Sequence, residues 1–336
     1  MKAWLANLKL PFIEDIEVHV RFLGTLPLLI AAELIVHKRT QSIVKEFLEP
    51  NLIGQADLQK FHQAISTALR WRNSVMAEAS MLVIVYVIGY QFIWHQSSAV
   101  NPSAWYTEPA LANGNLSLAG IWFRFFSLPL FQFLFLRWYY RIFIWSRFLF
   151  RVSRIKLKLV STHPDQVGGL GFLSNSIFAF MPLALAHGTL LAGTLANHIF
   201  FQGDKLLDFK MEIIIILILV LGIVILPLFS FSSQLAEAKR TGSMLYGRFA
   251  SQYVEEFETK WVKKEVDADP SLMGGDIQSL ADLSNSYKVV ETMHVLPITR
   301  NMIIMLVVIT ITPLSPLVLT MMPIGELIKM LAGILL

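Results

Sequence analysis

Six runs of apolar residues divide the chain, and their lengths are those of membrane-spanning helices. They lie at about residues 22–36, 75–94, 118–136, 177–200, 213–231 and 302–322. A helix needs about 20 apolar residues to cross the hydrocarbon core of a bilayer, so five runs are long enough. The first run has 15 residues, so we expect it to be tilted, re-entrant, or extended by Val18 and Val20. The pattern predicts an all-α fold, a polytopic membrane helix bundle of about six transmembrane helices in one domain.

Arginine and aromatic residues mark the end of the third run, in the stretch LFLRWYYRIFIWSR at residues 134–147. If the helix starts after Ser117, which is a favourable N-cap, about 20 residues bring it to Arg137. The aromatic rings that follow then lie at headgroup depth, and the arginines extend toward water. At 100° per residue, one helix face carries six basic residues: Arg137, Arg141, Arg147, Arg151, Arg154 and Lys158. We therefore expect the span to stop near Arg137 while its helix continues through Lys158.

Further amphipathic stripes occur in the loops on the same side of the predicted membrane. They consist of Leu58, Phe61, Ile65 and Leu69, of Leu245, Phe249, Tyr253, Phe257 and Trp261, and of Ile277, Leu280, Leu283 and Tyr287. Apolar stripes at helical spacing normally bury one another. The sequence thus predicts a helical bundle outside the membrane, formed by residues 37–74, 147–172 and 232–300.

Lysine and arginine are concentrated in alternate loops, and this asymmetry orients the chain. The loops 37–74, 147–172 and 232–300 together hold 19 of these residues. The two terminal tails and the other two loops together hold 6. Loops rich in basic residues remain in the cytoplasm. We expect the three large loops there and both termini outside.

The composition supports a membrane protein and narrows its chemistry. Hydrophobic residues make up 55% of the 336 residues and charged residues 15%, against about 25% charged residues in soluble domains. The chain has no cysteine, which excludes thiol nucleophiles, disulfides, and thiolate ligands for zinc or iron–sulfur clusters. The net charge of +4 is small and dispersed. The expected partner is therefore the lipid bilayer and not nucleic acid.

A glycine-rich turn, STHPDQVGGLGF at residues 161–172, joins the third and fourth runs. Asp165 can accept hydrogen bonds from the nearby backbone, and three glycines permit positive φ: Gly168, Gly169 and Gly171. Two interpretations remain open. The turn is a tight structural connection, or it is a site, either a backbone nest for an anion or a metal held by His163 and Asp165. Two ligands alone indicate a metal only weakly, so we assign none.

The stretch THPDQVGGLGFL after LPLFQFLFLRWYYRIFIWSRFLFRVSR, with DIQSLADLSNSYKVVETM and LPITR before the last run, resembles a family of uncharacterised bacterial inner-membrane proteins. The similarity runs through most of the chain, and the glycine turn is its most distinctive motif. The resemblance implies a location in the bacterial inner (plasma) membrane and the topology given above. It implies no activity.

Ionisable residues inside the apolar runs are candidates for a functional site. A charge at that depth costs about 2.5–3.5 kcal/mol and needs a partner or water. Glu33 is the obvious partner of Arg124 by charge, and such a pair is either structural or part of a route that favours anions. His187 and His198 share one helix face about 16 Å apart, but opposing haem ligands are lacking. We assign no cofactor.

Three classes of function remain. The first is a non-catalytic membrane component, an assembly or signalling partner that binds other proteins or further copies of itself through its cytoplasmic helices. The second is a channel or transporter for a small anionic solute, favoured by Arg124, Glu33 and the proline-interrupted sixth run ITPLSPLVL. The third is a membrane enzyme, although the sequence contains no HExxH, GxSxG or P-loop motif. We favour the first class.

The charge asymmetry predicts on which side of the membrane each loop lies. Reporters fused near Lys60, His163 and Lys264 should behave as cytoplasmic, and those near Asn101 and Asp204 as external. Alkaline phosphatase, which is active only outside, and green fluorescent protein, which folds only inside, distinguish the two cases. An external signal at Lys264 would contradict the whole predicted topology.

Overall fold

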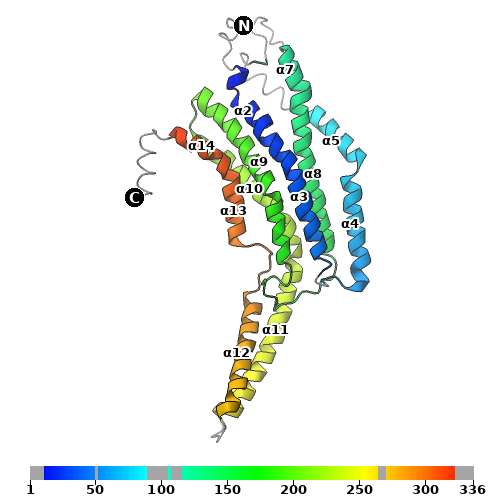
Figure 1. The fold of residues 1–336 in the computed structure, drawn as a ribbon, viewed down its shortest axis with the longest axis vertical. Coiled ribbons are helices and arrows are strands. Elements are labelled where there is room, and N and C mark those ends of the chain that lie inside the picture. The colour runs from blue at the N-terminus through cyan, green and yellow to red at the C-terminus, as the bar shows by residue number, and fades with distance from the viewer. Residues whose placement is uncertain (1–10, 50–51, 89–104, 107–115, 264–269, 322–336) are drawn as a thin grey trace.

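The computed structural model describes residues 11–49, 52–88, 105–106, 116–263 and 270–321, and it is an all-α bundle (Figure 1). Within these ranges no β-strand forms. Five continuous helices are long and apolar enough to cross a membrane. A sixth results if the helices Gln55–Arg72 and Val75–Ile88, bent by 45° at their junction, count as one span. The all-α membrane bundle predicted from the sequence is therefore confirmed.

The first helix extends well beyond its apolar run. It is continuous over 31 residues, Ile16–Glu46. Its parts are α2 (Ile16–His19), a π-helical segment (Val20–Thr25) and α3 (Leu26–Glu46). A continuous helix of this length agrees with a run extended by Val18 and Val20, and not with a re-entrant segment.

The next spanning helices are also longer than their apolar runs. The third run lies in a helix made of α7 (Leu118–Trp122), a π-helical segment (Phe123–Ser127) and α8 (Leu128–Val152). The fourth lies in a helix made of a 3-10 turn (Gly171–Ser174), α9 (Asn175–Asn197) and a π-helical segment (His198–Gln202). The fifth lies in a helix of 57 residues. This helix begins with a 3-10 turn (Leu206–Phe209) and α10 (Lys210–Ile225). It continues through a 3-10 segment (Leu226–Phe231) into α11 (Ser232–Phe257) and ends in a π-helical segment (Glu258–Val262).

The last spanning helix is interrupted where the sequence ITPLSPLVL predicts it. α13 (Arg300–Ile311) gives way to a 3-10 turn (Thr312–Leu314), then α14 (Ser315–Val318) and a final 3-10 turn (Leu319–Met321). Pro313 and Pro316 lack the N–H groups that a regular α-helix would need there. Residue 322 of the predicted run lies outside the described residues.

The helix that carries the arginines begins as predicted and ends earlier. Ser117 caps its start, because Ser117 Oγ accepts a hydrogen bond from Gly120 N at 3.0 Å. The helix passes Arg137 and ends at Val152, and turns and irregular segments occupy residues 153–170, where a helix was predicted as far as Lys158. The continuation through Lys158 is wrong, because Lys158 N donates to Leu52 O at 2.8 Å and pairs with another segment.

The second apolar run is described only in its first part. α5 (Val75–Ile88) covers its first part, and residues 89–94 lie outside the described residues. α4 (Leu58–Arg72) precedes it and packs along the end of α8. Two contacts with Trp71 of α4 join these helices. The Arg147 guanidinium lies 3.9 Å from the Trp71 ring centroid, in a cation–π contact. Tyr140 Oη donates a hydrogen bond to Trp71 O at 3.0 Å.

α9 lies at the centre of the bundle. Of its most apolar stretch, 61% is buried, against 17–22% in the other four spanning helices. Glycines allow its neighbours to approach closely. A Cβ on Gly188 would overlap the carbonyl oxygen of Thr310 in α13, and a Cβ on Gly193 would lie 2.8 Å from Val20 Cβ. Close approach through small residues is a common way for helices to pack within a membrane.

A buried apolar core continues into the end of the bundle that carries most of the basic loop residues. We call residues 37–72, 142–175 and 232–299 the basic end. Phe47 is fully buried there, with its ring centroid 4.9 Å from that of Phe172, 5.7 Å from Phe61 and 6.2 Å from Phe231. The loops 37–74 and 147–172 therefore pack against each other and against Phe231, although residues 153–170 are turns and not the helix that the predicted bundle required.

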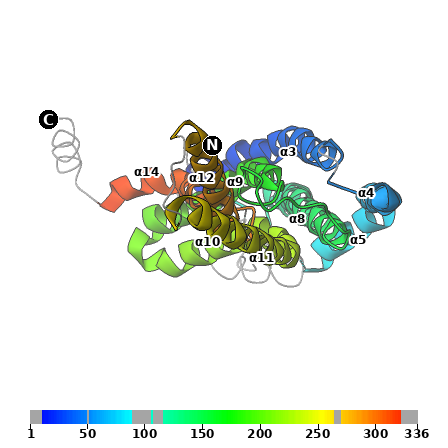
Figure 2. The ribbon, with the colours of Figure 1, turned by 90° about the horizontal axis from the view of Figure 1, so that it is seen from below.

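α11 and α12 (Pro270–Thr292) form an antiparallel hairpin that projects from the basic end (Figures 1 and 2). Tyr253 Oη donates to Asp276 O at 3.2 Å, and Trp261 Nε1 donates to Asp276 Oδ2 at 2.7 Å. Leu245 and Phe249 of the same predicted stripe are instead 65% and 56% exposed. Each step of four residues turns 40° around a helix, so a stripe from 245 to 261 cannot face one neighbour throughout.

The glycine contact between α9 and α13 predicts a selective loss of stability. Gly188→Ala should lower the free energy of unfolding by about 1–3 kcal/mol, because the new methyl group meets backbone that cannot move aside. Gly222→Ala in α10 is the matched control, since its nearest neighbour is Leu226 Cδ1 at 3.8 Å. Thermal unfolding in detergent micelles measures both variants. Equal melting temperatures would contradict the predicted contact.

Candidate functional site

The glycine-rich turn is built around the carboxylate of Asp165. Its Oδ1 accepts hydrogen bonds from Val167 N at 2.9 Å and Gly169 N at 3.2 Å, and its Oδ2 accepts one from Gly171 N at 2.8 Å. His163 Nδ1 lies 2.8 Å from Asp165 Oδ1. The sequence correctly grouped these residues in one local structure.

Positive backbone angles explain the glycines of this turn. Gly168 and Gly169 have φ of 66° and 94°, and Gln166 has φ of 57°. Gly168 is also confined by neighbours, because a Cβ there would lie 3.1 Å from Met293 Cε. His294 N donates to Gln166 O at 2.7 Å, which ties the turn to the segment before α13. The turn therefore connects three parts of the chain.

The nest of backbone N–H groups is already filled by the protein's own anion. The donors that an external anion would need all point at Asp165. Partial burial raises the pKa of this carboxyl, but hydrogen bonds from the three N–H groups and from His163 lower it further, below its ordinary value. In the part of the chain that the structure describes, no three His, Asp or Glu side chains group to hold a metal ion. The geometry supports the structural interpretation of the turn.

Glu33 and Arg124 do not form the pair that their charges suggested. Glu33 Oε1 lies 2.6 Å from the guanidinium of Arg141. Arg141 is 17 residues beyond Arg124 on the same helix, a distance of about 25 Å. Arg124 lies in the π-helical segment, with its guanidinium carbon 5.4 Å from the Phe125 ring centroid. A role of Arg124 in an anion route stays a prediction.

His187 is buried against α8 and uses both ring nitrogens. It is 5% exposed, and its Nδ1 lies 2.7 Å from Leu183 O. A carbonyl can only accept, so Nδ1 carries the proton and Nε2 accepts from Tyr139 Oη at 2.7 Å. No ring nitrogen is left for a metal. His187 links α8 to α9 through one hydrogen bond, a structural role.

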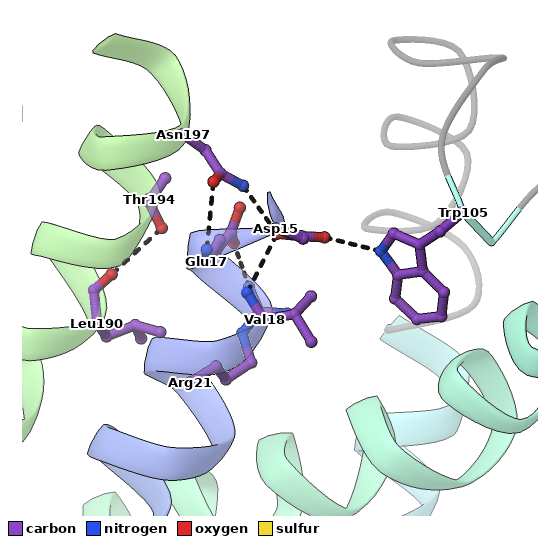
Figure 3. Close-up of polar contacts among 8 residues, drawn as sticks. All are labelled: Asp15, Glu17, Val18, Arg21, Trp105, Leu190, Thr194 and Asn197. Atoms are coloured by element: carbon purple, nitrogen blue, oxygen red, sulfur yellow. Dashed lines mark hydrogen bonds and ion pairs between the residues drawn. The ribbon is translucent and has the colours of Figure 1, made fainter. Parts of the chain in front are cut away.

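A polar cluster at the opposite end of the bundle was missed in the sequence (Figure 3). Asp15 is 3% exposed. Its Oδ2 accepts from Trp105 Nε1 at 2.9 Å, and its Oδ1 accepts from Asn197 Nδ2 at 2.9 Å and from Val18 N at 3.2 Å. Asn197 Oδ1 in turn accepts from Glu17 N at 3.3 Å. An asparagine inside the apolar run 177–200 was the available signal.

The Asp15 cluster fixes the start of the first helix against α9. Asp15 caps α2, Asn197 bonds to both Asp15 and the backbone of Glu17, and Trp105 reaches the same carboxylate from a distant segment (Figure 3). Arg21, one turn further along, pairs with Glu17. A buried carboxylate with three donors is satisfied by the protein itself. The arrangement supports a structural role.

Comparison of the chain with protein-family models, with curated proteins and with solved structures found no match. Function must therefore be inferred from the fold and from the residues themselves.

The Asp165 turn yields a stability prediction with a defined pH dependence. Asp165→Ala should lower the free energy of unfolding by about 1–3 kcal/mol at pH 7, because three backbone N–H groups lose their acceptor. His163→Ala should have less effect, because the ring is 44% exposed. Thermal unfolding in micelles measures both variants.

The sign of the pH effect follows from the lowered pKa of Asp165. The stabilisation is complete above the unfolded pKa of about 3.9 and is lost as the pH falls through the lower folded value. The difference between the parent and Asp165→Ala should therefore be full at pH 7 and shrink as the pH falls from about 3.9 through the lower folded value. A difference that is unchanged in strong acid would show that the charge of Asp165 is not what stabilises the turn.

Proposed function

We propose that the protein is a non-catalytic component of the bacterial inner membrane that binds a partner protein through the α11–α12 hairpin. The observation that carries this proposal is the exposed apolar surface on α11. Met244, Leu245 and Phe249 are all more than half exposed. Large apolar side chains grouped on a projecting element are typical of interaction sites. The partner is another protein or a second copy of this chain.

Contacts between its two helices hold the hairpin in a defined shape, which favours specific binding of a partner protein. Lys260 Nζ lies 2.6 Å from Asp276 Oδ2, and Trp261 Nε1 donates to the same oxygen. These hydrogen bonds from Lys260 and Trp261 lower the pKa of Asp276 below its ordinary value. This carboxylate links α12 to the π-helical segment at the end of α11. A surface presented in a fixed shape loses less entropy on binding.

The polar groups of the bundle support the same class of function. Asp165, Asp15 and His187 each satisfy their hydrogen bonds within the protein. Reactive groups in enzymes need a free face toward a substrate. The basic loops favour a cytoplasmic position for the hairpin, where soluble or membrane-bound partners are accessible.

A photocrosslinking experiment tests this proposal. A photoreactive amino acid placed at Leu245 or Phe249 should give the same discrete protein adduct in intact cells. Placed at Ser251, which is exposed on another face of α11, it should give little or none. Phe249→Asp should reduce the adduct formed at Leu245 severalfold, because a charge would have to be buried in the contact.

Two outcomes would contradict the proposal. Equal adducts at Ser251 and Leu245 would indicate random collision rather than a binding face. An anion flux in liposomes that depends on the purified protein and is abolished by Arg124→Gln would favour the transporter class instead.

A further inference from the structure

A groove of about 1010 Å³ runs along the outside of the bundle between α8 and the α10–α11 helix. It extends from Tyr139 to Arg151 along one wall and from Ile218 to Ser230 along the other. Twelve residues of helix are about 18 Å long, so the groove is long and narrow. Its lining is mostly apolar and includes Ile142, Phe143, Leu219, Gly222, Ile223 and Leu226.

Glycine and proline on the α10 side leave this space open. A Cβ on Gly222 would meet only Leu226 Cδ1, at 3.8 Å. Pro227 is the second residue of the 3-10 segment that follows α10, and it cannot continue the regular α-helical hydrogen bonds. The wall is therefore recessed over the middle of the groove.

The polarity of the groove changes from one end to the other. Its apolar part lies beside α10, the most apolar of the spanning helices. Arg147 and Arg151 line the opposite end, one helical turn apart. Both lie beyond Arg137, where the sequence places the edge of the membrane. The α8 wall, which begins at Tyr139, lies wholly beyond that residue, whereas the other wall lies within the fifth apolar run. The groove is therefore at the interface of the membrane, with the two arginines at one end of it.

The two arginines of the groove lack the carboxylates that the neighbouring arginines have. Arg137 and Arg141 pair with Glu78 and Glu33. Within the described residues no acidic side chain lies within ion-pair distance of Arg147 or Arg151. Both are partly buried, and Arg147 is held by stacking on Trp71. Two partly buried guanidinium groups without a protein carboxylate suit a phosphate.

We propose that this groove binds an anionic phospholipid, with one acyl chain along α10 and the phosphate between Arg147 and Arg151. The charge at one end and the apolar length behind it match the two parts of such a molecule. A zwitterionic phospholipid carries the same phosphate together with a cationic group of its own, which two neighbouring guanidinium groups repel. A small soluble anion would make no contact with the apolar walls of the groove.

Competition binding to the purified full-length protein tests the proposal. The probes are fluorescent phosphatidylglycerol and phosphatidylcholine with identical acyl chains. The parent should prefer phosphatidylglycerol about tenfold or more, and the Arg147→Gln, Arg151→Gln double variant should bind the two lipids within about twofold of each other. Arg240→Gln, which removes an exposed charge from the same end, should keep the preference.

Two further measurements distinguish a lipid phosphate from free phosphate and test whether the apolar walls of the groove contribute to binding. Inorganic phosphate in large excess should not displace phosphatidylglycerol, because it cannot use the apolar walls. Gly222→Leu should weaken binding of both lipids by filling the groove, and its melting temperature should match that of Gly222→Ala.

Several results would overturn the proposal. They are equal affinity of the parent for the two lipids, full displacement by inorganic phosphate, and loss of preference in Arg240→Gln to the same degree as in the double variant. Native mass spectrometry that shows a second copy of the chain in place of bound lipid, with the dimer lost in Gly222→Leu, would also overturn it.

Discussion

The close approach of helices around α9 is the constraint on which the rest of the bundle depends. Helices in lipid gain nothing from hiding apolar side chains from one another, so tight packing has to hold them together. Gly188 and Gly193 allow α13 and the first helix to reach the α9 backbone. Once these axes are fixed, His187 meets Tyr139 and Asn197 meets Asp15. The small residues allow the helices to approach one another, and these polar contacts then fix how far each helix is shifted along its neighbour.

The carboxylates that accept several hydrogen bonds serve the architecture in the structure. The Asp165 carboxylate closes a turn between two spans, and the Asp15 carboxylate anchors the first helix. Each is surrounded by donors from its own chain. The surfaces that remain available are of a different kind: the exposed side of α11 and the groove beside Arg147. Both suit binding better than reaction.

Local features of the fold could be predicted from the sequence, and pairings between distant segments could not. The apolar runs, the Ser117 cap and the Asp165 turn depend on residues within a few positions of one another. Glu33 was matched to Arg124 by charge alone, and the axial offset of the two helices places it beside Arg141 instead. Trp105 and Asp15 lie 90 residues apart, so only the folded chain brings them together. The end of α8 before Lys158 likewise depends on pairing with Leu52.

One continuous helix, Leu206–Val262, contains both the fifth spanning segment and the first arm of the hairpin. Its 57 residues measure about 85 Å along the axis. The 3-10 segment that contains Pro227 interrupts its α-helical hydrogen bonds, and proline is a common cause of bends in long helices. The second arm of the hairpin leads into α13, which touches α9 at Gly188. A force on the hairpin would therefore reach two separate spans, α10 through the 3-10 segment that contains Pro227 and α13 through the segment after α12.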